Sequence, residues 1–313
     1  MFQSVSYHHY VVKTLSEGVY AAIATFEGSA GSNSGILDLG NETLVFDTSS
    51  TLSAARELKE IAETLTGRHV TYVVNSHMHP DHIHGNAVFN DRSILISSSK
   101  TLKSIEKESN FRLESMHSKM LNEAEKFRRQ LINSTDQNER EKLISIIKAY
   151  DGFFEGYPTV EDLRFPTLTF ENALTFNGSE RKAVLLTWGG AHSPCDACLW
   201  LEEEGILFLA DLLVPKGNLI LPGGGNPDNW LTILDQAEEL GAKYLVPGHG
   251  EVIPAEKGFD WARSYLNNIF ELTDKALACG KSEENVEEFS VPEGCNEYWF
   301  RENMRFLMNH RKK

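Results

Sequence analysis

Both halves of the chain show the same order of segments, in which short apolar runs lead into a loop rich in histidine and aspartate. In the first half Val70–Val74 precedes such a loop, and in the second half Ile206–Ala210 and residues 244–246 do. Short runs rich in β-branched and aromatic residues are typical of strands. Because two sets of strands must each bury an apolar face, the sequence predicts an α/β protein with two packed sheets and outer helices, a four-layer αββα sandwich.

The remaining segments divide into strands and helices by their periodicity. The first 50 residues predict strands at 5–12, 19–26, 36–39 and 43–46, and residues 52–65 predict a helix that ends at Gly67. Residues 100–150 contain no glycine or proline, and their apolar residues recur every three or four positions except at 133–136. We expect a helical hairpin at 100–150, inserted in a single domain over 1–313. Periodicity does not distinguish a solvated hairpin from a lid or a dimerisation arm.

Composition limits the partners of the chain. The 313 residues include 30 Lys and Arg against 45 Asp and Glu, a net charge of −15. A surface this acidic repels nucleic-acid backbones and anionic lipid, so we expect neither nucleic acid nor membrane as a partner. No apolar run approaches the roughly 20 residues that span a bilayer, and the first residues lack the pattern of a signal peptide. Four cysteines do not form a disulfide framework, which favours a cytoplasmic protein.

The densest polar cluster is His77-Met78-His79-Pro80-Asp81-His82, directly after an apolar strand. A metal ion needs several donors that a short loop can direct at one point, and imidazole with carboxylate suits zinc and its neighbours. His77 and His79 share a face in an extended chain, and Pro80 fixes the turn that follows. A chance polar loop seldom has this spacing, so the cluster predicts a metal site.

The spacing His77-x-His79-x-Asp81-His82 resembles the HxHxDH signature of the metallo-β-lactamase superfamily. That superfamily also has a later histidine in a strand-end loop, an aspartate that ends a subsequent strand, and a final histidine in a Gly-His-Gly loop. The sequence contains these in the same order, as His192, Asp211 and His249. The resemblance covers about residues 17–250.

The resemblance implies two divalent ions per chain, taken as zinc, with iron or manganese as alternatives. It assigns one ion to His77, His79 and His192, the second to Asp81, His82 and His249, and Asp211 to both. A metal-bound hydroxide would be the nucleophile, and Asp81 would be the catalytic residue that orients it or carries its proton.

Three further residues receive roles with less support. Asp47 ends a strand before a Thr-Ser-Ser loop, where the family places an aspartate that orients the ligands. His84 follows the signature closely and is expected to support the ligands or to pack beside them. Lys216 lies five residues after Asp211. It either binds a substrate carboxylate, as in some lactamases, or is an exposed loop residue.

The resemblance implies hydrolysis of an ester-like bond, such as a lactone or thioester, in a small molecule. The best-known zinc β-lactamases carry cysteine where this chain has Asp211, which disfavours β-lactam hydrolysis and leaves it as an alternative. Phosphodiester cleavage at the same site is a second alternative. An iron-dependent oxidoreductase of the same fold and an inactive binding protein are rivals from other classes. The presence of all seven expected ligands argues against the inactive protein.

Overall fold

The computed structural model describes residues 2–89, 92–215 and 217–312. The chain forms two compact units. Unit 1 runs to Glu171 and includes Phe176–Lys182, and unit 2 comprises Asn172–Thr175 and the chain from Ala183 onward. The assignment of 1–313 to a single domain stays a prediction.

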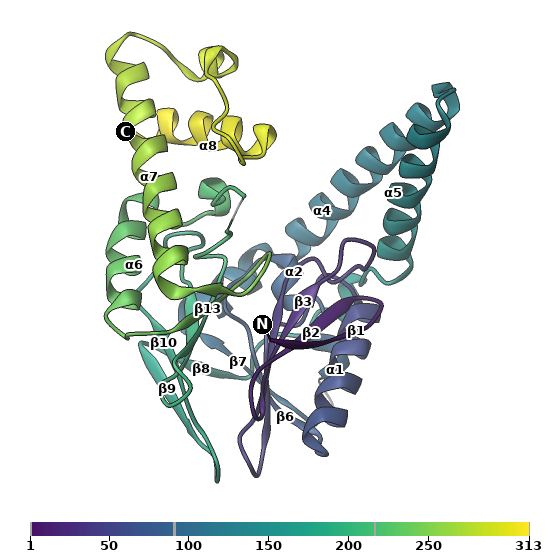
Figure 1. Cartoon of the computed structure of the whole chain (residues 1–313), viewed down its shortest axis with the longest axis vertical. Coiled ribbons are helices and arrows are strands. Elements are labelled where there is room, and N and C mark those ends of the chain that lie inside the picture. The colour runs from purple at the N-terminus through teal and green to yellow at the C-terminus, as the bar shows by residue number, and fades with distance from the viewer. Residues whose placement is uncertain (1, 90–91, 216, 313) are drawn as a thin grey trace. The chain divides into compact units, whose positions relative to one another are not determined.

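Unit 1 is built on a mixed sheet in which strands follow one another in sequence order (Figure 1). Among the described residues its eight strands are β1 (Gln3–Ser6), β2 (Tyr10–Ser16), β3 (Val19–Ala24), β4 (Ser34–Asp38), β5 (Thr43–Phe46), β6 (Val70–Val74), β7 (Ile94–Ser98) and β8 (Leu168–Phe170). Neighbours from β1 to β5 are antiparallel, and neighbours from β5 to β8 are parallel. Helix α1 (Leu52–Thr66) covers this sheet with Leu58 and Ala62, and it ends at Gly67 with φ of 67°, as expected.

One strand prediction is wrong. Residues 5–12 were expected to form a single strand, but β1 and β2 form an antiparallel hairpin with a turn between Tyr7 and Tyr10. The Tyr7 N–H donates to the Tyr10 carbonyl oxygen over 2.7 Å, which closes that turn. All four residues of β1 are exposed, so the apolar content of this segment does not reflect one continuous buried strand.

Two long helices leave the sheet of unit 1 side by side (Figure 1). These are α4 (Ser99–Asn133) and α5 (Gln137–Glu155), and they follow the short helices α2 (Pro80–Ile83) and α3 (Asn86–Phe89). The Asp136 side chain accepts from the Glu139 N–H and starts α5 where the sequence pattern breaks. A short 3₁₀ turn, Val160–Asp162, then leads back to β8.

Unit 2 contains the second sheet, with the strand order β14-β13-β12-β11-β10-β9. In the described residues these strands are β9 (Ala173–Asn177), β10 (Lys182–Thr187), β11 (Ala197–Leu201), β12 (Ile206–Ala210), β13 (Tyr244–Pro247) and β14 (Ile253–Pro254). Its helices are α6 (Trp230–Glu238), α7 (Ala255–Ala278) and α8 (Glu297–His310), with 3₁₀ turns at Leu221–Gly223, Pro227–Asn229 and Glu283–Glu288. Their buried side chains, among them Trp230, Phe259 and Phe300, form one core with the sheet.

The prediction of an α/β protein with two sheets and helices is therefore confirmed. Each sheet also contains a parallel pair that ends in candidate ligands. β5 and β6 end just before Asp47 and the histidine cluster, and β12 and β13 end just before Asp211 and His249. Parallel strands present their carboxyl ends at one edge, so each pair brings its polar loops together. In the described part of the chain, no helix has the length and apolar character needed to cross a membrane.

Candidate metal centre

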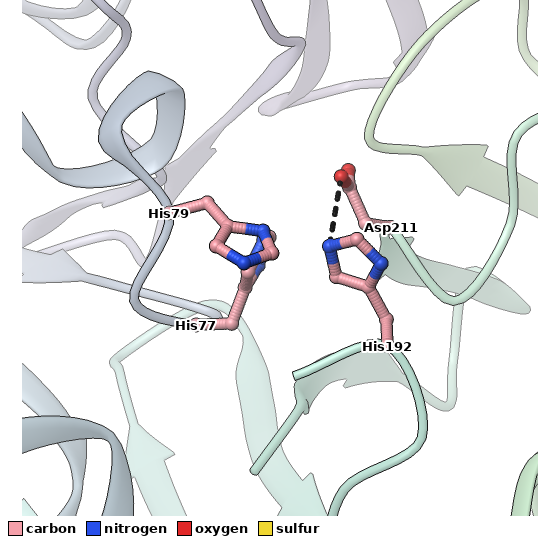
Figure 2. A group of neighbouring side chains, drawn as sticks. All are labelled: His77, His79, His192 and Asp211. Atoms are coloured by element: carbon pink, nitrogen blue, oxygen red, sulfur yellow. Dashed lines mark hydrogen bonds and ion pairs between the residues drawn. The ribbon is translucent and has the colours of Figure 1, made fainter. Parts of the chain in front are cut away.

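Unit 1 gathers the four residues of the HxHxDH spacing beyond the end of β6. His79 precedes α2 with an extended backbone, and Pro80 occupies the first turn of that helix. His77 Nε2 lies 3.1 Å from His79 Nδ1, and Figure 2 shows the two rings edge to face. The His77 and His82 rings lie 4.1 Å apart between centroids, and His82 Nε2 lies 3.5 Å from Asp81 Oδ2. One loop and one helical turn thus concentrate three imidazoles and one carboxylate.

Asp47 contacts His82 directly and His77 through Ser76. Its Oδ2 lies 2.8 Å from His82 Nδ1 and accepts from the Ser76 hydroxyl at 2.8 Å. Ser76 Oγ lies in turn 2.9 Å from His77 Nδ1, while the Ser76 N–H donates to Asp47 Oδ1. Burial raises the pKa of the Asp47 carboxyl, although His82 and the Ser76 hydrogen bonds act in the opposite direction. Hydrogen bonding at Nδ1 orients an imidazole so that Nε2 is presented for a metal, the arrangement expected of a residue that supports ligands.

The backbone at Asp47 is unusual. Its φ is 63°, a left-handed conformation that aspartate adopts more readily than most residues, and Ser49 has φ of 97°. Strain of this kind persists where the surrounding structure fixes it, often at functional sites. Here the Asp47 N–H donates to the Val74 carbonyl oxygen, which ties the end of β5 to β6 beside the cluster.

Asp47→Asn is expected to weaken metal binding about 10- to 100-fold, as for other groups that orient metal-bound histidines. The amide keeps the shape of the carboxylate but has one accepting oxygen, so it cannot accept from His82 and the Ser76 hydroxyl on one side and from the Ser76 N–H on the other. Competition with a chromophoric chelator measures this affinity. Asp235→Asn is the matched control, because the Asp235 side chain is 64% exposed on α6. Unchanged affinity in Asp47→Asn would contradict the role given to Asp47.

Unit 2 gathers the other three candidate ligands around Asp211. This residue follows β12, directly after Ala210 with φ of 47°. His192 Nε2 lies 3.3 Å from Asp211 Oδ2, the contact dashed in Figure 2, and His249 Nε2 lies 3.3 Å from Asp211 Oδ1. The two carboxylate oxygens of Asp211 therefore face two different imidazoles. His192 and Asp211 are buried, whereas the His249 side chain is 30% exposed.

Asp196 shapes the loop of His192, and the sequence interpretation did not single it out. Its buried carboxylate accepts the backbone N–H groups of Ala191, His192 and Ser193 at 2.8 to 3.0 Å. Asp196 could have been recognised from the sequence because it directly precedes the apolar strand β11. Asp196 also lies between Cys195 and Cys198, and Cys198 is fully buried in β11. Burial raises the pKa of the Cys198 thiol, which disfavours its thiolate form.

A second support for His192 comes from α8, outside the segment that carries the signature. His192 Nδ1 lies 2.9 Å from the Ile220 carbonyl oxygen. The Asn303 side chain holds the residues on both sides of Ile220, accepting from the Leu221 N–H and donating to the Leu219 carbonyl oxygen. Asn303 also donates to the Tyr265 hydroxyl on α7. The C-terminal helices thus fix the chain segment that orients His192.

Asn303→Leu is expected to lower the free energy of unfolding by about 3 kcal/mol. The Leu221 N–H and the Leu219 carbonyl group would lose their buried partner, and each such loss costs about 1–3 kcal/mol. Denaturant unfolding followed by tryptophan fluorescence measures the change. Asn309→Leu on the exposed face of the same helix is the control. Equal stability of the two variants would show that the Asn303 network contributes little.

The remaining predicted residues have separate outcomes. His84 is buried, its Nδ1 lies 3.3 Å from the Ser50 carbonyl oxygen, and its ring packs edge-on against Tyr157. Burial lowers the pKa of His84 to about 4, so the ring is neutral near pH 7. These contacts are those of a packing residue beside the cluster. Lys216 lies outside the described residues.

Comparisons with known proteins identify the family. The sequence model of the metallo-beta-lactamase superfamily matches residues 28–249. The Beta-lactamase-like protein 2 homolog of Caenorhabditis elegans is 22% identical over 263 residues, which cover 83% of this chain and 69% of that protein. A metallo-beta-lactamase from Pontibacter korlensis has a TM-score of 0.57 at 17% identity, covering 86% of this chain and 100% of its own. VMB-1 has a TM-score of 0.58 at 19% identity, covering 84% and 99%. These structures show the fold.

Proposed function

The chain belongs to the metallo-beta-lactamase superfamily, whose members are metallo-hydrolases, and on that premise we propose that it hydrolyses an ester-like bond of a small molecule. The bond is that of a lactone, a thioester or a related carbonyl compound. The observation that carries the proposal is the supported donor set itself. His82 and His77 are oriented through Asp47, and His192 through Ile220. Histidines whose second nitrogen is held in this way are typical of metal ligands.

The proposed ligands form two sets of residues. His77, His79, His192 and Asp211 are proposed to hold one divalent ion, and Asp81, His82 and His249 a second, with Asp211 shared between them. Imidazole and carboxylate donors fit zinc, and they also accept manganese or iron. When bound, the ions would lower the pKa of a water molecule and polarise the oxygen of the scissile carbonyl group.

The chain's own residues have distinct tasks in this proposal. The Asp81 side chain is 18% exposed, the most accessible carboxylate of the cluster in unit 1, so it can reach solvent and substrate. We propose that Asp81 carries the proton that is transferred during hydrolysis. Asp211 carries an oxygen toward each of two histidines, which suits a carboxylate that screens the repulsion between two cations. Asp47, Asp196 and Asn303 hold the loops in place.

The identity of residue 211 and the net charge favour carbonyl esters, thioesters and lactones over β-lactams and nucleic acid. Asp211 is neither the cysteine of the best-known zinc β-lactamases nor the serine of another subgroup. The net charge of −15 disfavours a polyanionic nucleic-acid substrate. Four cysteines in 313 residues are too few for a disulfide framework, which fits a reducing compartment, and we propose the cytoplasm.

An initial-rate panel on zinc-loaded protein tests the proposal. It compares a carboxyl ester, a lactone, a thioester and a β-lactam with a phosphodiester, and His79→Ala serves as the blank. We expect turnover of the ester, lactone or thioester that disappears in His79→Ala and in excess chelator. Turnover restricted to the phosphodiester, or equal rates in the blank, would contradict the proposal.

A further inference from the structure

Unit 1 contains an apolar cavity that begins at the candidate ligand Asp81. Its volume is about 480 Å³, within the range of small-molecule sites. Its walls come from the facing sides of the hairpin helices, with Met116, Met120 and Phe127 on α4 and Ile146, Tyr150 and Phe153 on α5. The loop between β3 and β4 closes another side. The cavity thus joins the inserted hairpin to the HxHxDH loop.

The loop between β3 and β4 is shaped to approach Asp81 closely. Gly31 has φ of 82°, and a Cβ placed there would lie 2.1 Å from Ser50 Oγ and 3.0 Å from the Asp81 Cβ. Only glycine permits this approach without displacing one of those side chains. Gly31, Ser50 and Asp81 therefore lie against one another in the lining of the cavity, and an occupant that fills the cavity contacts Asp81.

The chemistry of the lining selects for an uncharged apolar occupant. Among the described residues that line the cavity, none is Lys, Arg or His, and Asp81 is the one carboxylate. Burial, reinforced by the negative charge of Glu123 and opposed by Lys126, raises the pKa of the Tyr150 hydroxyl. An anionic group would therefore meet no cation among these lining residues. Methionine side chains adapt to ligands of varying shape, and Phe26 lies at the loop with 77% of its surface exposed.

We propose that this cavity binds the apolar acyl chain of the substrate and places the scissile carbonyl group beside Asp81. The proposal rests on the proposed function and narrows its substrate class to esters, thioesters or lactones with a neutral acyl chain of several carbons. The helical hairpin would then select the acyl chain of the substrate, rather than being only a solvated hairpin.

A series of thioesters from acetyl to octanoyl tests the proposal through chain length. Each added methylene that enters the cavity is expected to raise kcat/KM about fourfold, equivalent to about 0.8 kcal/mol, until the cavity is full. Ala149 also lines the cavity, so Ala149→Trp fills it from α5 and should flatten this dependence. Lys148→Trp places the same side chain on the exposed face and should keep the wild-type dependence. A flat wild-type series with measurable turnover would overturn the cavity proposal and leave the proposed hydrolase intact.

A binding measurement separates this proposal from the reaction. N-phenyl-1-naphthylamine is a neutral probe that fluoresces in apolar sites, and octanol competes for such sites without being hydrolysed. We expect saturable probe binding to wild type, displacement by octanol, and loss of both in Ala149→Trp and in Met120→Lys, which adds a charge to the lining. This result, together with no turnover of any ester, thioester or lactone, would support the cavity and contradict the proposed hydrolase. If wild type does not bind the probe, the cavity is not an acyl site.

Discussion

Asp211→Ala is expected to lower kcat/KM for the preferred carbonyl substrate at least about 10³-fold. The carboxylate of Asp211 faces both His192 and His249, so its removal would take a shared donor from the two proposed ions. The Lewis-acid effect of a bound metal is worth several kcal/mol, and each 1.36 kcal/mol corresponds to tenfold in rate. Initial rates and metal content of the purified variant measure the loss.

The control for this variant is Asp235→Ala on the exposed face of α6. Both variants should show the circular dichroism of the wild type, because neither removes apolar packing. Full activity of Asp211→Ala with wild-type metal content would mean that the chemistry occurs elsewhere in the chain.

Gly248→Ala is expected to lower metal affinity and kcat/KM about 100-fold or more. A Cβ at this position would lie 1.9 Å from Asp211 Oδ1 and 2.8 Å from the Ala210 carbonyl carbon. Backbone atoms on one side prevent a simple shift, so the methyl group must displace the Asp211 carboxylate or the end of β13. A displacement of about 1 Å at a catalytic group commonly costs 10²-fold.

Gly152→Ala is the matched control for the glycine variant. It lies in α5, and nothing within 4 Å would meet its Cβ. It should leave activity unchanged. If Gly248→Ala also retained wild-type activity, the close contact of Gly248 with Asp211 would have no part in holding that carboxylate.

Periodicity and local signals predict the elements whose formation depends on nearby residues. The hairpin at 100–150 was expected from spacing and from the polar break at 133–136, and the helices run from Ser99 to Asn133 and from Gln137 to Glu155. Gly67 ends α1 because glycine adopts a left-handed φ without steric cost. The strand expected at 5–12 failed because a turn of ordinary residues, without glycine or proline, interrupts it.

The supports of the candidate ligands were harder to predict than the ligands. Asp47 is detectable because it ends an apolar strand, and it contacts His82 and Ser76 in the structure. Asn303 lies 84 residues from Leu219, and no local pattern links them. Its role depends on how α8 packs, a tertiary property. The acyl cavity likewise needs the hairpin to face the loop at Gly31, which periodicity alone does not specify.

The most direct test of the central claim is metal content. Elemental analysis of the purified wild-type chain by mass spectrometry, after dialysis, should find about two divalent ions per chain. His79→Ala and Asp211→Ala should each hold fewer, in parallel with their loss of hydrolysis. A wild-type chain that binds no divalent ion in stoichiometric amount, yet hydrolyses its substrate in excess chelator, would contradict the account of a metal-dependent hydrolase.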